Sequence, residues 1–253
     1  MAEDAEKQWR FLVSTRIRVG EDLTLPPDQS HHLADVLRLS EGRRVRLFTG
    51  GGEEFEGVVR SADPEASIVR VRRRVRSEDA AGVAVTLGFA PPRGARADWL
   101  VEKATELGAR RLIPLLCERL ERFPVERARK RRERWERKAE EAARQSGRTV
   151  IPAIEEPVPP GQFAGSCGAP LRLACHAGSG VPGLWGALRG MDQVPAAAAL
   201  AIGPGGGFTD RELAQLNRSG WQFVSLGPTT LRTETACVVA LGCLSVRGEQ
   251  GEG

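Results

Sequence analysis

The segment from Ala201 to Thr209 combines residue types that could bind a small ligand through backbone atoms. It reads Ala-Ile-Gly-Pro-Gly-Gly-Gly-Phe-Thr, and the small apolar residues before it predict a buried strand. Glycine lets a chain turn tightly and approach a ligand closely. Thr209 and Glu212 have the spacing of a capping box, which predicts that a helix begins there. Strand, turn and helix together favour a nucleotide-like ligand, although such turns also occur for purely structural reasons.

Two common nucleotide sites do not match this segment. A phosphate-binding P-loop ends in Gly-Lys-Ser/Thr, and a dinucleotide fold places an acidic residue about 20 positions further on. Neither is present, and the loop lies late in its domain rather than at the first strand-to-helix turn. A second glycine-containing turn runs from Gly227 to Ala236, again without lysine. Two such loops suit an adenosine-containing ligand that carries no phosphates.

The histidines and cysteines do not form a recognisable metal site. His31 and His32 could indicate metal binding or acid-base chemistry, but no other ligand cluster accompanies them, so helix packing or RNA contact is favoured. The five cysteines contain no Cys-x-x-Cys pair and are expected to be structural thiols of a cytoplasmic protein. They are Cys117, Cys167, Cys175, Cys237 and Cys243.

Strands and helices alternate from about residue 83, which predicts a parallel sheet covered by helices. The expected strands are 83–90, 111–116, 171–175, 197–202 and 222–226, and the expected helices are 97–107, 125–145, 211–217 and 233–246. Prolines between 152 and 160 are interpreted as a connection. In the helix 125–145, an apolar stripe is flanked by Arg and Glu, and it consists of Ala128, Trp135, Ala139, Ala142 and Ala143.

The first 78 residues instead predict a small β-barrel with one helix. The expected strands are 11–19, 44–48, 55–60 and 67–76, and the helix is 31–39 with Ser30 as a possible N-cap. Such barrels often bind oligonucleotides. Arginines at positions 70, 72, 73, 74 and 76 would place a basic rim along the last strand. A solvated edge strand protected by charge explains them equally well.

Composition limits the class of protein and locates its positive charge. The chain has 253 residues with 37 Lys plus Arg against 33 Asp plus Glu, and 41% of residues are hydrophobic. This excludes a disordered tail, and no uncharged stretch reaches the roughly 20 apolar residues of a spanning helix. Residues 1–78 carry 14 basic and 14 acidic groups, 118–148 carry 12 and 7, and 149–253 carry 6 and 8. The basic segment 118–148 could face RNA or form a solvated helix.

The two glycine loops together resemble a family signature. Ile202 to Phe208 and Leu226 to Ala236 are similar to the C-terminal signature of the RsmE family, the 16S ribosomal RNA uracil-N3 methyltransferases of the SPOUT superfamily. Further matches follow in the expected order across residues 9–246. They are His31-His32-Leu33, Val36-Leu37-Arg38, Gly42, Lys103, Glu106-Leu107-Gly108, Pro114, Glu118-Arg119, Arg134-Trp135, Glu141-Ala142 and Gln145-Ser146-Gly147-Arg148.

This resemblance implies an α/β protein with a PUA-like RNA-binding barrel at 1–78 and a trefoil-knotted methyltransferase domain at 79–253. It also implies a homodimer that binds S-adenosyl-L-methionine and 16S ribosomal RNA of the small subunit, without a metal. The implied cofactor-binding residues are His176, Gly178, Ile202, Gly203, Pro204, Gly205, Gly206, Leu226, Gly227, Leu231, Arg232, Thr233 and Ala236. The expected RNA-binding residues are His32, Arg38, Arg70, Arg72, Lys103, Arg119 and Arg148.

Arg232 and Glu234 are the expected catalytic residues. Methylation of uracil N3 requires loss of its proton, which Arg232 would assist by stabilising the uracil anion. Glu234 would either orient Arg232 or accept the proton; alternatively, Arg232 grips phosphate and Glu234 only caps a helix. Gly205 stands where the family usually has Glu. That departure leaves open an RNA-binding ribosome assembly factor without catalysis, and a SPOUT methyltransferase acting on another RNA is a further alternative.

Overall fold

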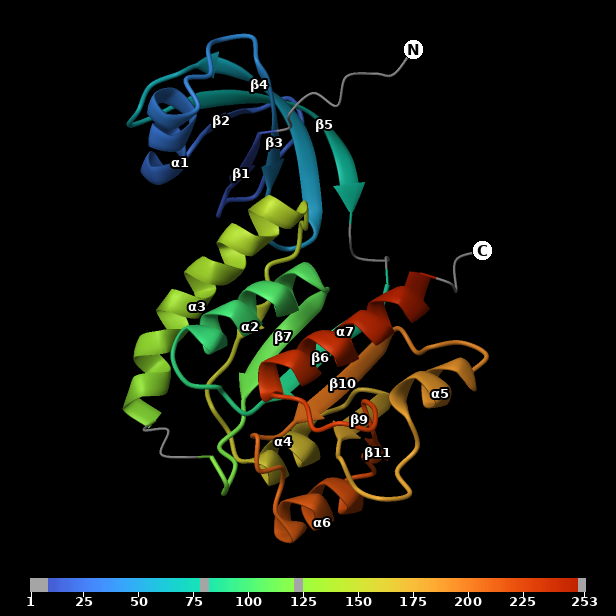
Figure 1. Cartoon of the computed structure of the whole chain (residues 1–253). Helices are drawn as coiled ribbons and strands as arrows, with labels where there is room; N and C mark the ends of the chain where they lie inside the picture. The colour runs from blue at the N-terminus through green and yellow to red at the C-terminus, as the bar shows by residue number, and fades with distance from the viewer. Residues whose placement is uncertain (1–8, 78–81, 121–124, 250–253) are drawn as a thin grey trace. The chain divides into compact units, whose positions relative to one another are not determined.

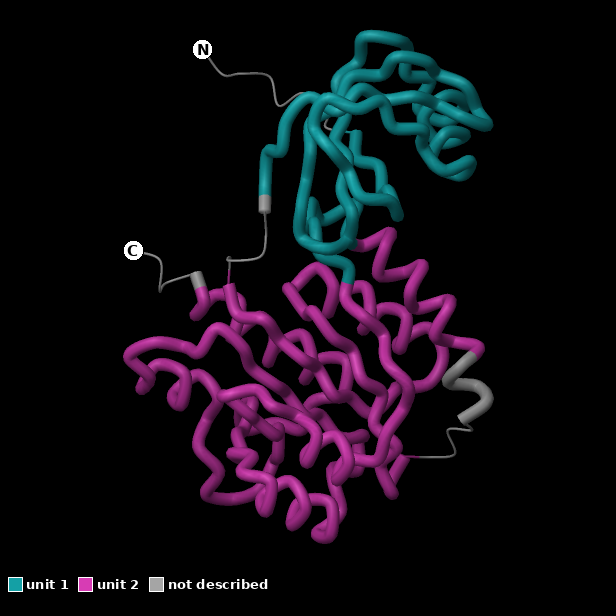
Figure 2. The backbone as a smooth tube through the Cα atoms, turned by 180° about the vertical axis from the view of Figure 1, so that it is seen from behind, with its two compact units in different colours: residues 1–80, 143–151 teal, residues 81–142, 152–253 magenta. Residues whose placement is uncertain are grey.

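The computed structural model describes residues 9–77, 82–120 and 125–249. Two compact units divide the chain, and Figure 2 colours them separately. Unit 1 comprises residues 1–80 and 143–151, and unit 2 comprises residues 81–142 and 152–253. The boundary expected between residues 78 and 79 lies outside the described residues. The segment 143–151, which is distant in sequence, belongs with the N-terminal unit.

Unit 1 is built on a five-stranded sheet with the order β1-β3-β4-β5-β2. β1 pairs parallel to β3, while the other neighbours are antiparallel. Alternate residues of the strands point into one apolar core, which includes Leu47, Val59 and Val69. The strands are β1 (Arg10–Leu12), β2 (Asp22–Thr24), β3 (Arg44–Phe48), β4 (Glu53–Ser61) and β5 (Ile68–Ser77).

The helical segment of unit 1 begins earlier than expected. α1 (Pro27–His31) continues directly into η1 (His32–Val36), a π-helical turn. Ser30 is therefore inside the helix, and the prediction that it caps the N-terminus is wrong. Its buried hydroxyl donates to the Leu25 carbonyl and accepts from the Ser67 amide at 2.9 Å, so it joins the helix to the start of β5.

The segment 143–151 is fixed in unit 1 by the guanidinium of Arg10. Nη1 of Arg10 donates to the carbonyl of Ala143 at 2.9 Å, and Nη2 donates to that of Arg148 at 3.0 Å. Nε forms an ion pair with Glu54 at 2.7 Å, and the guanidinium lies 4.6 Å from the centre of the Phe48 ring. Arg10 thus satisfies carbonyls at a helix end that would otherwise lack partners.

Unit 2 contains a six-stranded parallel sheet with the order β11-β9-β10-β6-β7-β8. β10 lies between β9 and β6, so the strand order departs from the chain order on that side (Figure 1). The strands are β6 (Ala84–Phe89), β7 (Ala109–Pro114), β8 (Ala153–Ile154), β9 (Leu171–Cys175), β10 (Ala197–Ile202) and β11 (Gln222–Val224).

Helices cover both faces of this sheet, as Figure 1 shows. α2 and α7 pack together over β6, β7 and β10 on one face. α4 and α6 cover the other, where Phe163 and Leu216 join the core cluster with Ala199. A Cβ on Gly88 of β6 would lie 2.5 Å from the Phe163 ring, so α4 can approach only because this residue is glycine. The helices are α2 (Ala95–Glu106), α3 (Val125–Ser146), α4 (Pro160–Ser166), α5 (Leu184–Arg189), α6 (Asp210–Arg218) and α7 (Thr233–Glu249).

Most of the expected elements are present, with some corrections. The strand expected at 11–19 ends at Leu12, while β2, β8, α4 and α5 are elements that the sequence patterns did not predict. In α3, Trp135 and Ala139 of the apolar stripe are buried, and the side chain of Ala128 lies outside the described part. Of the helices within the described ranges, none has the length and apolarity needed to cross a membrane.

Candidate functional site: a pocket at the ends of three strands

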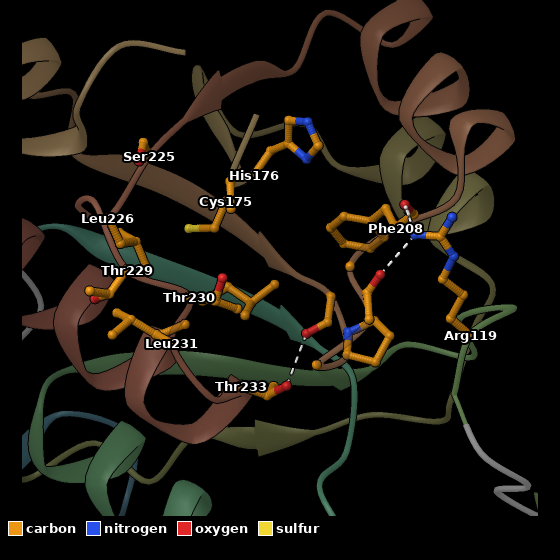
Figure 3. Close-up of a pocket in the computed structure, with 18 of the residues that line it drawn as sticks. Arg119, Cys175, His176, Phe208, Ser225, Leu226, Thr229, Thr230, Leu231 and Thr233 are labelled. Carbon is orange, nitrogen blue, oxygen red and sulfur yellow. Dashed lines mark hydrogen bonds between the residues drawn. The ribbon is translucent and has the colours of Figure 1, made fainter. Parts of the chain in front are cut away.

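A cavity of about 300 Å³ lies in unit 2 where β9, β10 and β11 end. Its walls are residues 175–177 after β9, residues 202–208 after β10 and parts of 225–236 after β11 (Figure 3). Parallel strands place their carboxyl ends at one edge of a sheet, and ligands of open α/β sheets bind there. The strand order that puts β10 between β9 and β6 therefore brings three distant loops together.

The glycine loop after β10 is fixed at its far end by a buried carboxylate. Glu212 of α6 accepts hydrogen bonds from the Thr209 amide at 2.7 Å and from the Glu118 amide at 2.8 Å. The Thr209 hydroxyl in turn accepts from the Glu212 amide, which completes the expected capping box. Glu212 is only 2% exposed. The carboxylate thus joins the loop to the segment that follows β7.

Arg119 fastens the middle of the same loop. Its Nη1 donates to the carbonyl of Gly206 at 2.7 Å and to that of Phe208 at 3.3 Å, as the dashed lines in Figure 3 show. Gly207 has a φ of +70°, which side chains rarely adopt. A Cβ on Gly203 would lie 3.3 Å from Phe208, so the loop is packed tightly against that ring.

The loop after β11 is joined to the glycine loop by Thr233. The Thr233 hydroxyl, at the first residue of α7, donates to the Gly203 carbonyl at 3.0 Å (Figure 3). Gly227 has a φ of +131°, and its amide donates to the Ser225 hydroxyl at 3.3 Å. These contacts order two sides of the pocket through main-chain atoms.

The loop after β9 contributes a thiol and an imidazole. Burial raises the pKa of Cys175 to about 12, with a smaller contribution from Cys243, so the thiol is neutral at physiological pH. The His176 ring packs at 5.9 Å from the Phe223 ring. A Cβ on Gly178 would lie 2.6 Å from Nε2 of His176, so Gly178 leaves space for that ring.

The pocket is nearly free of formal charge. Among the described residues that line it, Arg119 is the single arginine, and lysine, aspartate and glutamate are absent. Leu226, Leu231 and Ile202 supply apolar surface, while carbonyl and amide groups of the glycine loops supply polar atoms. Such a lining suits a ligand with an apolar body and a few hydrogen-bonding groups.

Most residues expected to bind a cofactor line this cavity. They are His176, Ile202, Gly203, Pro204, Gly205, Gly206, Leu226, Gly227, Leu231, Thr233 and Ala236. Gly178 and Arg232 are not among the lining residues. The lining residues that sequence reasoning did not assign to the cofactor are Arg119, Cys175, Ala177, Gly207, Phe208, Ser225, Thr229 and Thr230. Of these, all but Cys175, Ala177 and Ser225 lie in the quoted motifs, so membership of the signature was the signal that could have found them.

Arg232 and Glu234 are both near the pocket but are not paired with each other by a described contact. Arg232 is exposed, and within the described residues no hydrogen bond or ion pair of its guanidinium is found. Glu234 is 7% exposed, and its carboxylate lies 3.6 Å from Nη1 of Arg96 on α2. Glu234 thus connects the start of α7 to α2.

The residues expected to bind RNA occur in both units. His32, Arg38, Arg70, Arg72 and Arg148 belong to unit 1, and Lys103 and Arg119 belong to unit 2. Arg38 is the one non-glycine residue with a positive φ in the described ranges, at +52°. Lys103 pairs with Glu102 and Glu106, both at 2.8 Å, which raises its pKa.

Comparison with known proteins shows the family to which this chain belongs. The family model described as an RNA methyltransferase domain matches residues 79–245, and that of an RNA methyltransferase PUA domain matches residues 25–72. Ribosomal RNA small subunit methyltransferase E of Synechocystis is 35% identical over 92% of this chain and 76% of its own length. The chain belongs to the RsmE family. The relative from Mycobacterium bovis is 33% identical over 93% of this chain and 90% of its own.

Two solved structures share the fold over nearly the whole chain. A Legionella pneumophila methyltransferase in complex with S-adenosylmethionine has a TM-score of 0.82 at 30% identity, covering 95% of this chain and 98% of its own. Ribosomal RNA small subunit methyltransferase E from Neisseria gonorrhoeae, also bound to S-adenosylmethionine, has a TM-score of 0.83 at 25% identity, covering 94% and 97%. The family thus shares both parts of this fold, the α/β unit and the small N-terminal β unit.

Proposed function

We propose that this protein transfers the methyl group of S-adenosyl-L-methionine to N3 of a uridine in 16S ribosomal RNA of the small ribosomal subunit. The observation that carries this proposal is the cavity formed by the loops after β9, β10 and β11 in a chain of the RsmE family. Relatives with this fold are named as small-subunit RNA methyltransferases, and two neighbours bind S-adenosylmethionine. A ribosomal substrate also fits a cytoplasmic location.

The pocket fits the proposed cofactor in size and in the chemistry of its lining. Its volume is at the lower end of the range for ligand pockets, about 300 to 1,000 Å³. S-adenosylmethionine has no phosphates, which agrees with a lining in which the described residues include no lysine. We propose that Leu226, Leu231 and Ile202 contact its apolar parts, and that main-chain groups of the glycine loop hold its polar edge. The bound sulfonium supplies an activated methyl group.

Arg232 is proposed to act on the uracil. Deprotonation of N3 leaves negative charge on the neighbouring carbonyl oxygens, which a guanidinium can stabilise. The Arg232 side chain is exposed beside the pocket and is not held by a carboxylate within the described residues. Because Glu234 pairs with Arg96, we propose that Glu234 acts as a positioning residue: it fixes the start of α7, from which Arg232 extends.

Knotting and dimer formation are also parts of this proposal. The amide of Leu184 donates to the Ser225 carbonyl at 2.8 Å, and the Ser225 amide donates to the Pro182 carbonyl at 2.8 Å. A segment after β9 thus pairs with the end of β11, beside the path to α7. The trefoil knot itself is proposed on the family resemblance. A homodimer is proposed on the same resemblance.

One labelling experiment tests the proposed function. The protein is incubated with methyl-labelled S-adenosylmethionine and small ribosomal subunits that lack uridine N3 methylation, and the label is mapped. We expect one labelled uridine in 16S ribosomal RNA. Label on another base or another RNA would contradict the target. Absence of label despite measured binding of cofactor and RNA would instead favour an assembly factor without catalysis.

A further inference from the structure

Arg119 supplies the one fixed charge among the described residues that line the pocket of unit 2. The other titratable side chains of that lining are Cys175 and His176. The raised pKa of Cys175 keeps its thiol neutral, and an imidazole is positive only when it is protonated. A guanidinium keeps its charge throughout the physiological pH range. A ligand in this pocket therefore meets one permanent cation.

The guanidinium of Arg119 uses only one of its three nitrogens within the described residues. Nη1 makes both bonds to the glycine loop, donating to the carbonyls of Gly206 and Phe208. Nε and Nη2 have no hydrogen-bond partner in the described part of the chain. The adjacent carboxylate of Glu118 pairs with Arg211 instead, at 3.7 Å. The edge formed by Nε and Nη2 is therefore available to a ligand.

Two sets of contacts fix the position of this guanidinium. The buried carboxylate of Glu212 accepts from the amide of Glu118 at 2.8 Å, which anchors the main chain next to Arg119. The side chain itself is held at 2.7 Å by the glycine loop. A group that is already ordered loses less entropy when it binds a ligand. The available edge of Arg119 is thus suited to a planar anion such as a carboxylate, which accepts two parallel hydrogen bonds.

The lining of the pocket has an arginine end and an apolar end. Figure 3 shows Arg119 on one side of the pocket and Leu226 with Thr229 on the other. S-adenosylmethionine also has two chemically different ends, an adenosine and an amino-acid group with a carboxylate. A carboxylate that leaves water needs a cation or several hydrogen-bond donors. Of the described lining residues, Arg119 is the side chain that offers both.

We propose that Arg119 binds the carboxylate of the methionine part of S-adenosylmethionine through Nε and Nη2. This inference rests on the proposed function, because that function requires the cofactor. The sequence predicts an RNA contact for Arg119, whereas its place in the lining of the pocket favours the cofactor. The carboxylate is the one anionic group of S-adenosylmethionine, so a single fixed cation in the pocket is sufficient to recognise it.

The proposed contact predicts which relatives of the cofactor bind well. S-adenosylhomocysteine keeps the carboxylate and lacks the sulfonium charge, whereas decarboxylated S-adenosylmethionine keeps the sulfonium and lacks the carboxylate. A hydrogen-bonded ion pair at an exposed side chain contributes roughly tenfold to affinity. Wild-type protein should therefore bind S-adenosylmethionine about tenfold more tightly than the decarboxylated compound. We call this ratio of the two dissociation constants the carboxylate preference.

The test compares wild-type protein with Arg119→Gln and with a control variant, Arg211→Gln. Arg211 is exposed and pairs with Glu118, so the control removes the same charge nearby without changing the lining. Calorimetry measures the dissociation constants of S-adenosylmethionine, S-adenosylhomocysteine and the decarboxylated compound. We expect the carboxylate preference to disappear in Arg119→Gln and to persist in Arg211→Gln. S-adenosylhomocysteine should lose affinity in Arg119→Gln by the same factor as S-adenosylmethionine.

An unchanged carboxylate preference in Arg119→Gln would overturn the proposal, because a residue that only fastens the loop affects all three ligands by one common factor. Weaker binding of 16S ribosomal RNA with unchanged cofactor affinities would assign Arg119 to RNA and also refute it. Loss of the preference in His176→Gln alone would identify His176 as the partner instead. The proposed function fails in a different way: wild-type protein would bind S-adenosylmethionine with the expected preference yet transfer no label to small ribosomal subunits.

Discussion

The two sheets of this protein offer binding surfaces of different kinds. The sheet of unit 2 is covered by helices on both faces, so only its strand ends are open, and the pocket there is made mainly of main-chain atoms and glycines. The sheet of unit 1 leaves part of one face exposed, and arginines are the most frequent side chains there. In unit 2 the helices leave the loops at the strand ends accessible, whereas in unit 1 part of the strand face itself is accessible.

This difference predicts how each site responds to mutation. A pocket built from backbone tolerates many side-chain changes but not a changed backbone conformation, because glycine is needed where φ is positive. A surface built from exposed arginines tolerates small backbone adjustments, but its affinity for a polyanion falls with each positive charge that is removed. Four tests sharpen the contrast, beginning with the largest expected effect on activity.

Arg232→Ala should have the largest effect on activity. Loss of one group that stabilises a developing anion lowers kcat by roughly 10² to 10³-fold. The cavity itself should still bind S-adenosylmethionine, because Arg232 is not among its lining residues. Single-turnover rates and cofactor dissociation constants measure the two effects, and Arg218→Ala is the exposed control. A rate within threefold of wild type would remove Arg232 from the mechanism.

Glu212→Ala should test whether a buried side chain supports the backbone-built pocket. It leaves the amides of Thr209 and Glu118 without their acceptor, and each unpaired buried donor costs about 1 to 3 kcal/mol. We expect a lower free energy of unfolding together with weaker cofactor binding. Denaturant titration and calorimetry measure these changes. Exposed Glu133→Ala is the control, and equal losses in both variants would refute this role of Glu212.

Two glycines of the pocket should differ although both line it. Gly227 has a φ of +131°, whereas Gly205 has no positive φ and has open space where the methyl group of an alanine would lie. Gly227→Ala imposes about 1 to 3 kcal/mol of backbone strain, so cofactor affinity should fall roughly tenfold. Gly205→Ala should change it less than twofold. Equal affinities in the two variants would show that backbone conformation is not what limits binding.

His32 provides the smallest predicted effect, in unit 1. Burial lowers the pKa of its imidazole, with contributions from Arg144 and His31. The unfolded chain therefore binds this proton more readily, and the stabilisation present above about pH 6.5 is lost as the pH falls below that value. The effect is small because the side chain is largely exposed. His32→Gln should flatten the dependence of unfolding free energy on pH between about 5 and 7. His31→Gln should flatten it less, because His31 makes the smallest of the three contributions to the lowered pKa.

Sequence reasoning succeeded best where one physical signal dominated. β9 and β10 have the predicted bounds because buried parallel strands are short apolar runs that end at glycine, proline or polar residues. The capping box at Thr209 and Glu212 is present because its pattern is local. The two glycine loops were predicted as binding elements for the same reason, and both line the pocket.

Elements that depend on tertiary contacts could not be predicted. α4 and α5 have seven and six residues, contain glycine, and form because Phe163 and Leu184 are buried against the rest of unit 2. The pairing of Glu234 with Arg96 joins residues far apart in sequence, so no local pattern reveals it. Likewise, membership of Cys175 in the pocket follows from the position of β9 beside β10 and β11.

The bond from Thr233 to the Gly203 carbonyl has a consequence for the time at which the pocket forms during synthesis. Thr233 and Ala236 belong to α7, which the ribosome makes after every described strand of the sheet. A nascent chain that ends before α7 has all six strands of unit 2 but lacks the pocket residues Thr233 and Ala236. The cofactor site therefore closes only after α7 has left the exit tunnel, so a partly made chain cannot hold S-adenosylmethionine as the finished protein does.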